Sequence, residues 1–146
     1  MGLFDKVFGG NQPAKLNAQE SFIGVTLAAV AADGNINQDE LQGVFTALYR
    51  MKMFKGVNEK QMKEMFERVA SVIKKQGAGA IMTSANETLT PEMKETAFAV
   101  AADLVLADGV VEDEEKKFLD ELQKALCVNE SLAVKIAEVL VVKNRG

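Results

Sequence analysis

Apolar residues recur along nearly the whole chain with the three-to-four-residue spacing of amphipathic helices. Strand-like alternation is absent, and there are only 2 prolines. The pattern predicts helices over residues 17–32, 38–54, 59–76, 91–107, 112–126 and 130–142, with a shorter one over 79–87. We therefore expect an all-α protein, a single-domain helical bundle of about 6–8 helices.

Residues suited to helix ends support these boundaries. Asn58 and Asn129 are natural N-caps, and Gln61 follows Asn58 at capping-box spacing. Pro91 follows a threonine, as expected at the first position of a helix. Gly77 lies where a helix is expected to stop.

The sequence contains an internal repeat. Aligning residues 32–40 with 107–115 gives the shared pattern Ala-Asp-Gly-x-[Ile/Val]-x-x-[Asp/Glu]-Glu, and Val-Asn-Glu recurs at 57–59 and 128–130. Each copy then consists of an apolar helix, an Asp-Gly turn, an acidic helix and a third helix. We expect repeat one (17–76) and repeat two (91–146) to be related by a pseudo-twofold axis, with a linker or short helix over 77–90.

The apolar helix of each copy is expected to form the centre of the core. Small side chains would let the two helices approach closely, and a steep crossing would place both Asp-Gly turns on a common face. An antiparallel arrangement would place the turns at opposite poles. The expected central residues are Val25, Leu27, Ala28, Ala31, Ala97, Val100, Ala101, Leu104 and Val105.

Residues 1–16 precede this domain (17–146) as an amphipathic segment and linker. Leu3, Phe4, Val7 and Phe8 recur there at helical spacing. Docking against the body, contact with a membrane or partner, and disorder all remain open for this segment. No apolar run reaches the length of a membrane-spanning helix, so we expect no transmembrane segment.

Charge and residue usage narrow the function classes. With 48% hydrophobic residues, 26% charged residues and a net charge of −4, the chain fits a globular protein that binds cations or basic partners rather than nucleic acid. There is no histidine, which removes the commonest general base, so we expect no enzyme. The single cysteine, Cys127, excludes an intramolecular disulfide, and its apolar neighbours predict a buried side chain rather than a reactive thiol.

Acidic residues are concentrated at the two Asp-Gly turns and at the starts of the helices that follow them. Asp33 and Asp108 are expected at helix C-termini, where the helix dipole disfavours an anion. Either each caps its own turn, or each pairs with the glutamate seven residues on, Glu40 or Glu115, around a cation, or each binds a partner. Carboxylates favour calcium, magnesium or manganese. Four further acids lie in the first turns of the next helices and form a candidate partner-binding surface: Asp39, Glu112, Asp113 and Glu114.

A calcium-sensor EF-hand does not fit these turns. Taking Gly34 or Gly109 as the sixth loop position places alanines or leucines at positions 1 and 3. Both positions need oxygen ligands for calcium. The turns are therefore a different kind of acidic motif.

The doubled Asp-Gly-x-[Ile/Val]-x-x-x-Glu motif, in an all-α chain of this length, resembles the tellurite-resistance TerB family over roughly residues 20–142. Residues 4–7, Phe-Asp-Lys-Val, also look like the start of such proteins. The resemblance implies a cytoplasmic or membrane-peripheral protein of tellurite and other stress responses, without established enzymatic activity. It implies protein partners in that system and a metal-binding or partner-binding surface at Asp33, Glu40, Asp108 and Glu115.

Two hypotheses follow from these features. In the first, the chain is an acidic adaptor that responds to a divalent cation. In the second, it is a structural interaction module in which the acids only cap helices and a groove of methionine and aliphatic side chains binds the partner. The methionines are otherwise expected to fill or rim the core: Met51, Met53, Met62, Met65, Met82 and Met93.

Overall fold

The computed structural model describes residues 15–31, 37–107, 109 and 111–145. Over these residues the chain is helical and contains no strand. The helices are α2 (Ala18–Val30), α3 (Gln38–Tyr49), the short 3-10 helix η2 (Lys52–Phe54), α4 (Glu59–Gln76), α5 (Ala78–Thr88), α6 (Pro91–Val105), α7 (Asp113–Ala125) and α8 (Glu130–Lys143). The predicted all-α class is confirmed, whereas the pseudo-twofold relation and the division into repeats stay predictions. None of the described helices combines the length and apolarity needed to cross a membrane.

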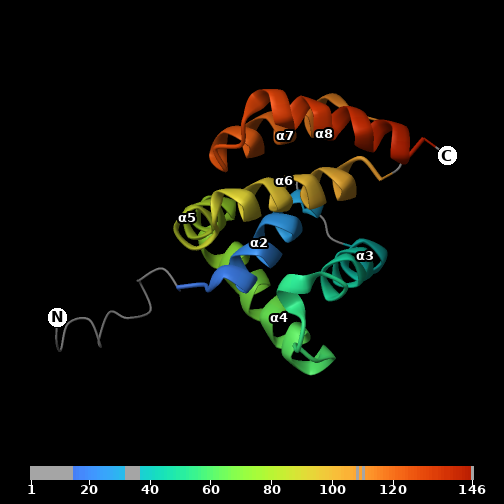
Figure 1. Cartoon of the computed structure of the whole chain (residues 1–146). Coiled ribbons are helices and arrows are strands. Elements are labelled where there is room, and N and C mark those ends of the chain that lie inside the picture. The colour runs from blue at the N-terminus through green and yellow to red at the C-terminus, as the bar shows by residue number, and fades with distance from the viewer. Residues whose placement is uncertain (1–14, 32–36, 108, 110, 146) are drawn as a thin grey trace.

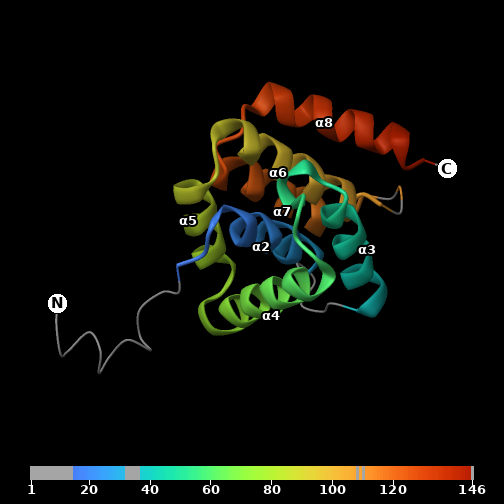
Figure 2. The same cartoon turned by 60° about the horizontal axis from the view of Figure 1, so that its bottom comes forward.

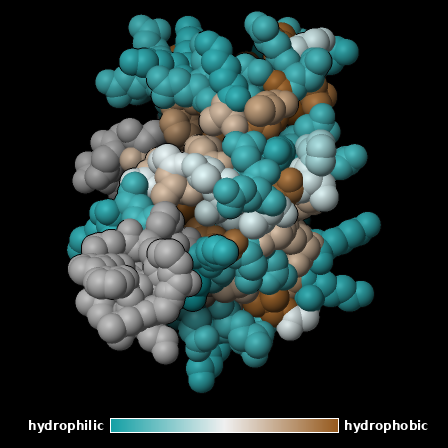
Figure 3. Space-filling model, turned by 90° about the vertical axis from the view of Figure 1, so that its left-hand side faces the viewer, coloured by the Kyte–Doolittle hydropathy of each residue, from teal (hydrophilic) through white to brown (hydrophobic). Residues whose placement is uncertain are grey.

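The helices are arranged around α2 and α6. Helix α6 lies between the α7–α8 pair on one side and α2 on the other, with α4 beyond α2 (Figures 1 and 2). Helix α5 covers one end of this arrangement and α3 lies at the other. Seen from the α5 end, hydrophilic side chains predominate and apolar ones show in small separate patches (Figure 3).

Helix α2 is enclosed along most of its length. Every residue from 20 to 29 is buried, including the polar side chains of Glu20, Ser21 and Thr26. The Thr26 hydroxyl donates to the carbonyl oxygen of Ile23 at 2.7 Å, and the Thr88 hydroxyl of α5 donates to the Ser21 hydroxyl at 2.9 Å. These bonds matter because a buried polar group without a partner is costly.

The predicted core is correct for most of α2 and only partly correct for α6. Five of the expected residues are buried: Val25, Leu27, Ala28, Ala97 and Ala101. The other four are only partly buried: Ala31, Val100, Leu104 and Val105. The buried stripe of α6 runs through Ala97, Phe98, Ala101 and Ala102, which share one face of a helix, and the opposite face is only partly covered. Met62 is fully buried and the other internal methionines pack against the core, as expected.

The predicted helix over 38–54 is interrupted in the structure. Helix α3 ends at Tyr49, Met51 takes an extended conformation and η2 follows. The break turns the chain so that Phe54 is buried and packs edge-on against Phe22 of α2, with ring centroids 6.3 Å apart. The predicted caps Asn58, Thr90 and Asn129 are all confirmed.

The predicted burial of Cys127 is wrong, because this residue occupies the turn that ends α7. Its φ is +57°, and its thiol is exposed while Leu126 and Val128 on either side are buried. Its N–H donates to the Lys124 carbonyl oxygen at 3.1 Å, and the Val128 N–H donates to the Gln123 carbonyl oxygen at 3.0 Å. This is the Schellman pattern, in which glycine is the usual left-handed residue.

Helix α2 can approach α5 closely because Gly24 has no side chain. A Cβ at this position would lie 2.7 Å from Cγ2 and 2.9 Å from Cδ1 of Ile81, which is itself fully buried. Such distances are shorter than van der Waals contact, and a packed core cannot move aside without strain. Gly24 therefore sets how near these two helices lie.

Replacing Cys127 by glycine should stabilise the fold by about 0.5–1 kcal/mol, because a left-handed conformation costs a residue with a Cβ about 1–2 kcal/mol. Urea denaturation of Cys127→Gly against Cys127→Ala measures this effect. Alanine retains the Cβ and should match the natural residue. A glycine variant no more stable than the alanine variant would contradict the conformational argument.

The Gly24→Ala substitution should destabilise the protein by about 1–3 kcal/mol through overpacking against Ile81. Gly43→Ala is the matched control, because Gly43 lies within α3 and a Cβ there meets nothing within 4 Å. The control should gain roughly 0.5–1 kcal/mol from its better helix propensity. In an Ile81→Ala background, Gly24→Ala should cost less, and an unchanged cost would refute the close contact.

Candidate functional site

The first acidic cluster lies at the start of α3. Asn37 caps the helix by accepting the Glu40 N–H at 2.7 Å, and its own side-chain amide donates to Oε1 of Glu40 at 3.1 Å. The second carboxylate oxygen, Oε2 of Glu40, is buried and has no hydrogen-bond partner within the part of the chain that the structure describes. The neighbouring Asp39 is exposed.

The second acidic cluster lies at the start of α7. Oε1 of Glu115 accepts the backbone N–H of Glu112 at 2.9 Å, which is the reciprocal bond of a capping box. Asp113 is fully exposed, and its carboxylate lies 3.8 Å from the ammonium of Lys116. Glu114 is also exposed. The first turns of both helices thus present several acids to solvent, where the helix dipole favours them.

Asp33 and Asp108 lie outside the described residues. Helices α2 and α6 lead into their turns, and both run from the α5 end toward the α3 end, so their C-terminal ends lie on the same side of the molecule (Figures 1 and 2). These ends therefore do not lie at opposite poles of the molecule, as antiparallel apolar helices would place them. Among residues 15–31, 37–107, 109 and 111–145, no three His, Cys, Asp or Glu side chains group closely enough to hold a metal.

The turn before α7 is joined to the end of α8. Gly109 has a φ of +75°, and a Cβ there would lie 2.8 Å from the carbonyl oxygen of Asn144. The carboxylate of Asp103 accepts from the ammonium of Lys143 at 3.2 Å and from the side-chain amide of Asn144 at 2.9 Å. Asp103 thus lies at a partly exposed edge of α6 and ties α6 to α8.

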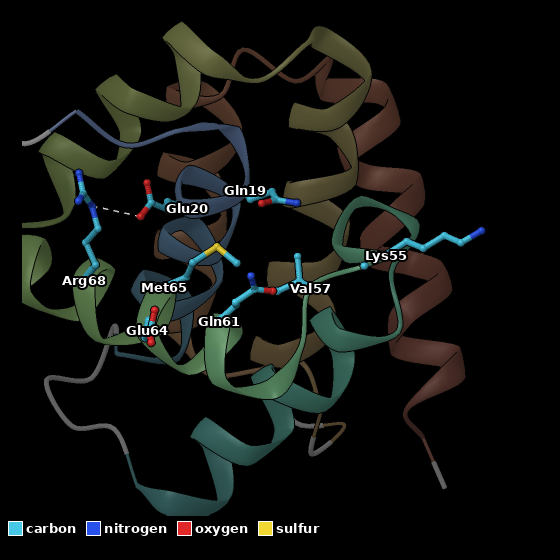
Figure 4. A pocket seen from close by; sticks show the side chains of 9 residues that line it. Gln19, Glu20, Lys55, Val57, Gln61, Glu64, Met65 and Arg68 are labelled. Carbon is cyan, nitrogen blue, oxygen red and sulfur yellow. Dashed lines mark ion pairs between the residues drawn. The ribbon is translucent and has the colours of Figure 1, made fainter.

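A groove that sequence reasoning missed lies between the start of α2 and the first half of α4. Its volume is about 490 Å³ (Figure 4). Six of its nine lining residues are polar or charged, and only Met65 among the internal methionines lines it. This does not match the expected groove of methionine and aliphatic side chains. The lining residues are Gln19, Glu20, Lys55, Gly56, Val57, Gln61, Glu64, Met65 and Arg68.

Glu20 is the most enclosed charged group of the groove. Its Oε1 accepts the Asn17 N–H at 3.1 Å, and its Oε2 lies 3.1 Å from Nε of Arg68, toward which it points in Figure 4. The Arg68 guanidinium also donates to the carbonyl oxygen of Lys15 at 3.0 Å. The sequence signal for this arrangement was the Asn17-x-x-Glu20 spacing of a capping box, but nothing local identifies Arg68 as the partner.

Removing the Glu20 side chain should destabilise the protein by about 1–3 kcal/mol, because both the cap and a shielded ion pair are lost. Glu20→Gln should cost much less, since its amide oxygen can accept the Asn17 N–H as Gln61 does for Asn58 in α4. Arg68→Ala should cost less than about 1 kcal/mol, because the Arg68 side chain is 54% exposed. Urea denaturation ranks the three variants, and a glutamine as damaging as alanine would show that the ion pair outweighs the cap.

The sequence profile of the family described as tellurite resistance protein TerB matches residues 19–137. Neither the curated proteins nor the solved structures contain a match. The matched region runs from the start of α2 into α8 and includes both acidic turns. The chain belongs to the tellurite-resistance TerB family.

Proposed function

We propose that this TerB-family chain is a non-enzymatic acidic adaptor of a tellurite and stress response, and that its two Asp-Gly turns bind divalent cations. Asp33 with Glu40 would form one site, and Asp108 with Glu115 the other. The observation that carries the proposal is the buried Oε2 of Glu40, which has no hydrogen-bond partner among the described residues.

A buried carboxylate oxygen without a donor lacks the interactions that water would give it. Leaving such a group unsatisfied costs about 1–3 kcal/mol, and more where it is charged. A cation held between Glu40 and Asp33 would supply the missing interaction. A ligand set made of carboxylates suits calcium, magnesium or manganese better than softer metals.

The exposed acids give the adaptor its surface for a partner. Asp39 at the start of α3 and Glu112, Asp113 and Glu114 at the start of α7 are all exposed. Negative charge of this kind steers and orients a basic face on a partner protein. We infer that the partner is another protein of the same response, and that it contacts these first turns.

A second function has its own support. Oε1 of Glu115 accepts the Glu112 N–H at 2.9 Å, so this acid already has a capping role without any ion. In this alternative the chain is a structural interaction module and every acid of the turns serves its helix. The two functions differ in what a glutamine would do, because glutamine keeps the capping oxygen and loses the charge.

Calorimetric titration of calcium, magnesium and manganese into Glu40→Gln should show an affinity at least roughly tenfold below that of the natural chain, a loss of about 1.4 kcal/mol. Asp39→Asn is the matched control, because it removes the same charge one residue away from an exposed position. The control should bind almost normally.

The adaptor proposal fails at its cation step if the natural chain binds none of the three ions at millimolar concentration. It also fails if Glu40→Gln and an Asp33→Asn/Asp108→Asn double variant bind as the natural chain does. Unchanged binding together with a lowered melting temperature in the double variant would favour the capping role.

A further inference from the structure

The end of α8 lies against the turn that joins α6 to α7. Helix α8 ends next to the C-terminal end of α6 (Figures 1 and 2). A Cβ at Gly109 would lie 2.8 Å from the carbonyl oxygen of Asn144 and 3.7 Å from Cα of Arg145. Backbone therefore meets backbone at this point, and we call residues 143–145 the α8 latch.

Side chains hold the latch to α6. The carboxylate of Asp103 accepts from the side-chain amide of Asn144 at 2.9 Å and from the ammonium of Lys143 at 3.2 Å. The same ammonium donates to Oδ1 of Asn144 at 3.1 Å, so the three side chains form a closed set of hydrogen bonds. The bond from Asn144 is partly buried, whereas those from Lys143 are exposed and worth less. Asn144 is therefore the main anchor of the latch.

Gly109 allows the contact in two ways. Its φ of +75° lies in the region that favours glycine, and the missing Cβ leaves room for the Asn144 carbonyl group. Its N–H donates to the Leu106 carbonyl oxygen at 3.1 Å and so closes the turn after α6. Gly56 has a similar φ of +90°, yet no described atom lies within 4 Å of the position of its Cβ. The close approach at Gly109 is thus a property of the latch and not of every left-handed glycine.

We propose that the α8 latch regulates the second Asp-Gly turn, so that the turn binds its cation more tightly when the latch is docked than when it is released. The proposal rests on the cation-binding function proposed above for Asp108 and Glu115. A turn held in one conformation loses less freedom when a ligand binds, so docking raises the affinity. Coupling of this kind is reciprocal, and a bound ion should therefore hold the latch in place. The latch lies beyond residue 137, where the match to the family profile ends.

Hydrogen exchange measured by NMR on the full chain tests the latch from the α8 side. Asn144→Asp places two carboxylates face to face, and the Gly109 N–H should then exchange about threefold to tenfold faster, as the loss of one hydrogen bond implies. Asn144→Ala, which removes the anchor without adding a charge, should act in the same direction.

Exchanging the two partners should restore the latch. In Asp103→Asn/Asn144→Asp the amide and the carboxylate trade places, so the same bond forms in the opposite direction and the Gly109 N–H should exchange at nearly its natural rate. The unfavourable effect of an acid at the end of α8 is common to this variant and to Asn144→Asp. Rescue therefore reports the contact between α6 and α8.

Gly109→Ala tests the latch from the turn. Its Cβ would meet the Asn144 carbonyl oxygen, so the Asn144 N–H, which donates to the Leu140 carbonyl oxygen at 2.9 Å, should exchange faster. Gly56→Ala is the matched control, because it introduces the same left-handed strain where a Cβ has no described neighbour within 4 Å. The control should leave the exchange of the Asn144 N–H unchanged.

Calorimetric titration of calcium, magnesium and manganese connects the latch to the ion. Every chain in this series carries Glu40→Gln, so that the second turn accounts for the remaining binding. Adding Asn144→Asp should lower the affinity about threefold to tenfold, and the exchanged pair should restore it. An added carboxylate would by itself attract a cation, so a fall in affinity cannot be an effect of charge.

Each part of the proposal can fail separately. An unchanged exchange rate of the Gly109 N–H in Asn144→Asp would show that the latch does not hold the turn. Faster exchange with unchanged ion affinity would show that the latch does not regulate binding. A Glu40→Gln chain that binds none of the three ions at millimolar concentration would refute the cation function of the second turn and its regulation, while the exchange rates would still decide whether the latch holds the turn. Melting curves show whether each variant is folded.

Discussion

The fold depends on enclosing α2, a helix that carries polar groups and must still pack closely on every side. Residues 20–29 are all buried, and α3, α4, α5 and α6 each contact the helix. Gly24 allows the contact with Ile81, while Ser21 and Thr26 find hydroxyl or carbonyl partners within the core. Apolar burial supplies the driving force, but these local fits determine which arrangement of helices is accepted.

Enclosing α2 also determines which oxygens of the capping glutamates have partners. Because its N-terminus is covered by α4, the carboxylate of Glu20 is held between the Asn17 N–H and Arg68, which leaves it no free oxygen for a ligand. At the start of α3, by contrast, Glu40 has one satisfied oxygen and one buried oxygen with no partner in the described residues. The two glutamates follow an Asn at the same capping spacing, yet within the described part of the chain only the first has partners for both carboxylate oxygens.

Local patterns in the sequence predicted what is local in the structure. Helical periodicity located the helices, and Asn58, Thr90 and Asn129 were recognised as caps because a cap depends on residues three positions away. Features that depend on distant residues were not predictable. Phe54 breaks the predicted helix over 38–54 because it packs on Phe22, and Glu20 meets Arg68 from another helix. The predicted burial of Cys127 was wrong because apolar neighbours indicate burial, whereas a left-handed turn between two buried residues directs the side chain outward.

The turn before α7 and the end of α8 form one structural unit. Gly109 lies so near the carbonyl oxygen of Asn144 that a Cβ there would approach it to 2.8 Å, and Asp103 holds both Lys143 and Asn144. Movement of this turn must therefore be accommodated by the last turn of α8. Lys143 belongs to the exposed face of that helix as well as to the contact with Asp103. The contacts of Gly109 with Asn144 and of Asp103 with Lys143 and Asn144 therefore connect this turn and α6 physically to the end of α8.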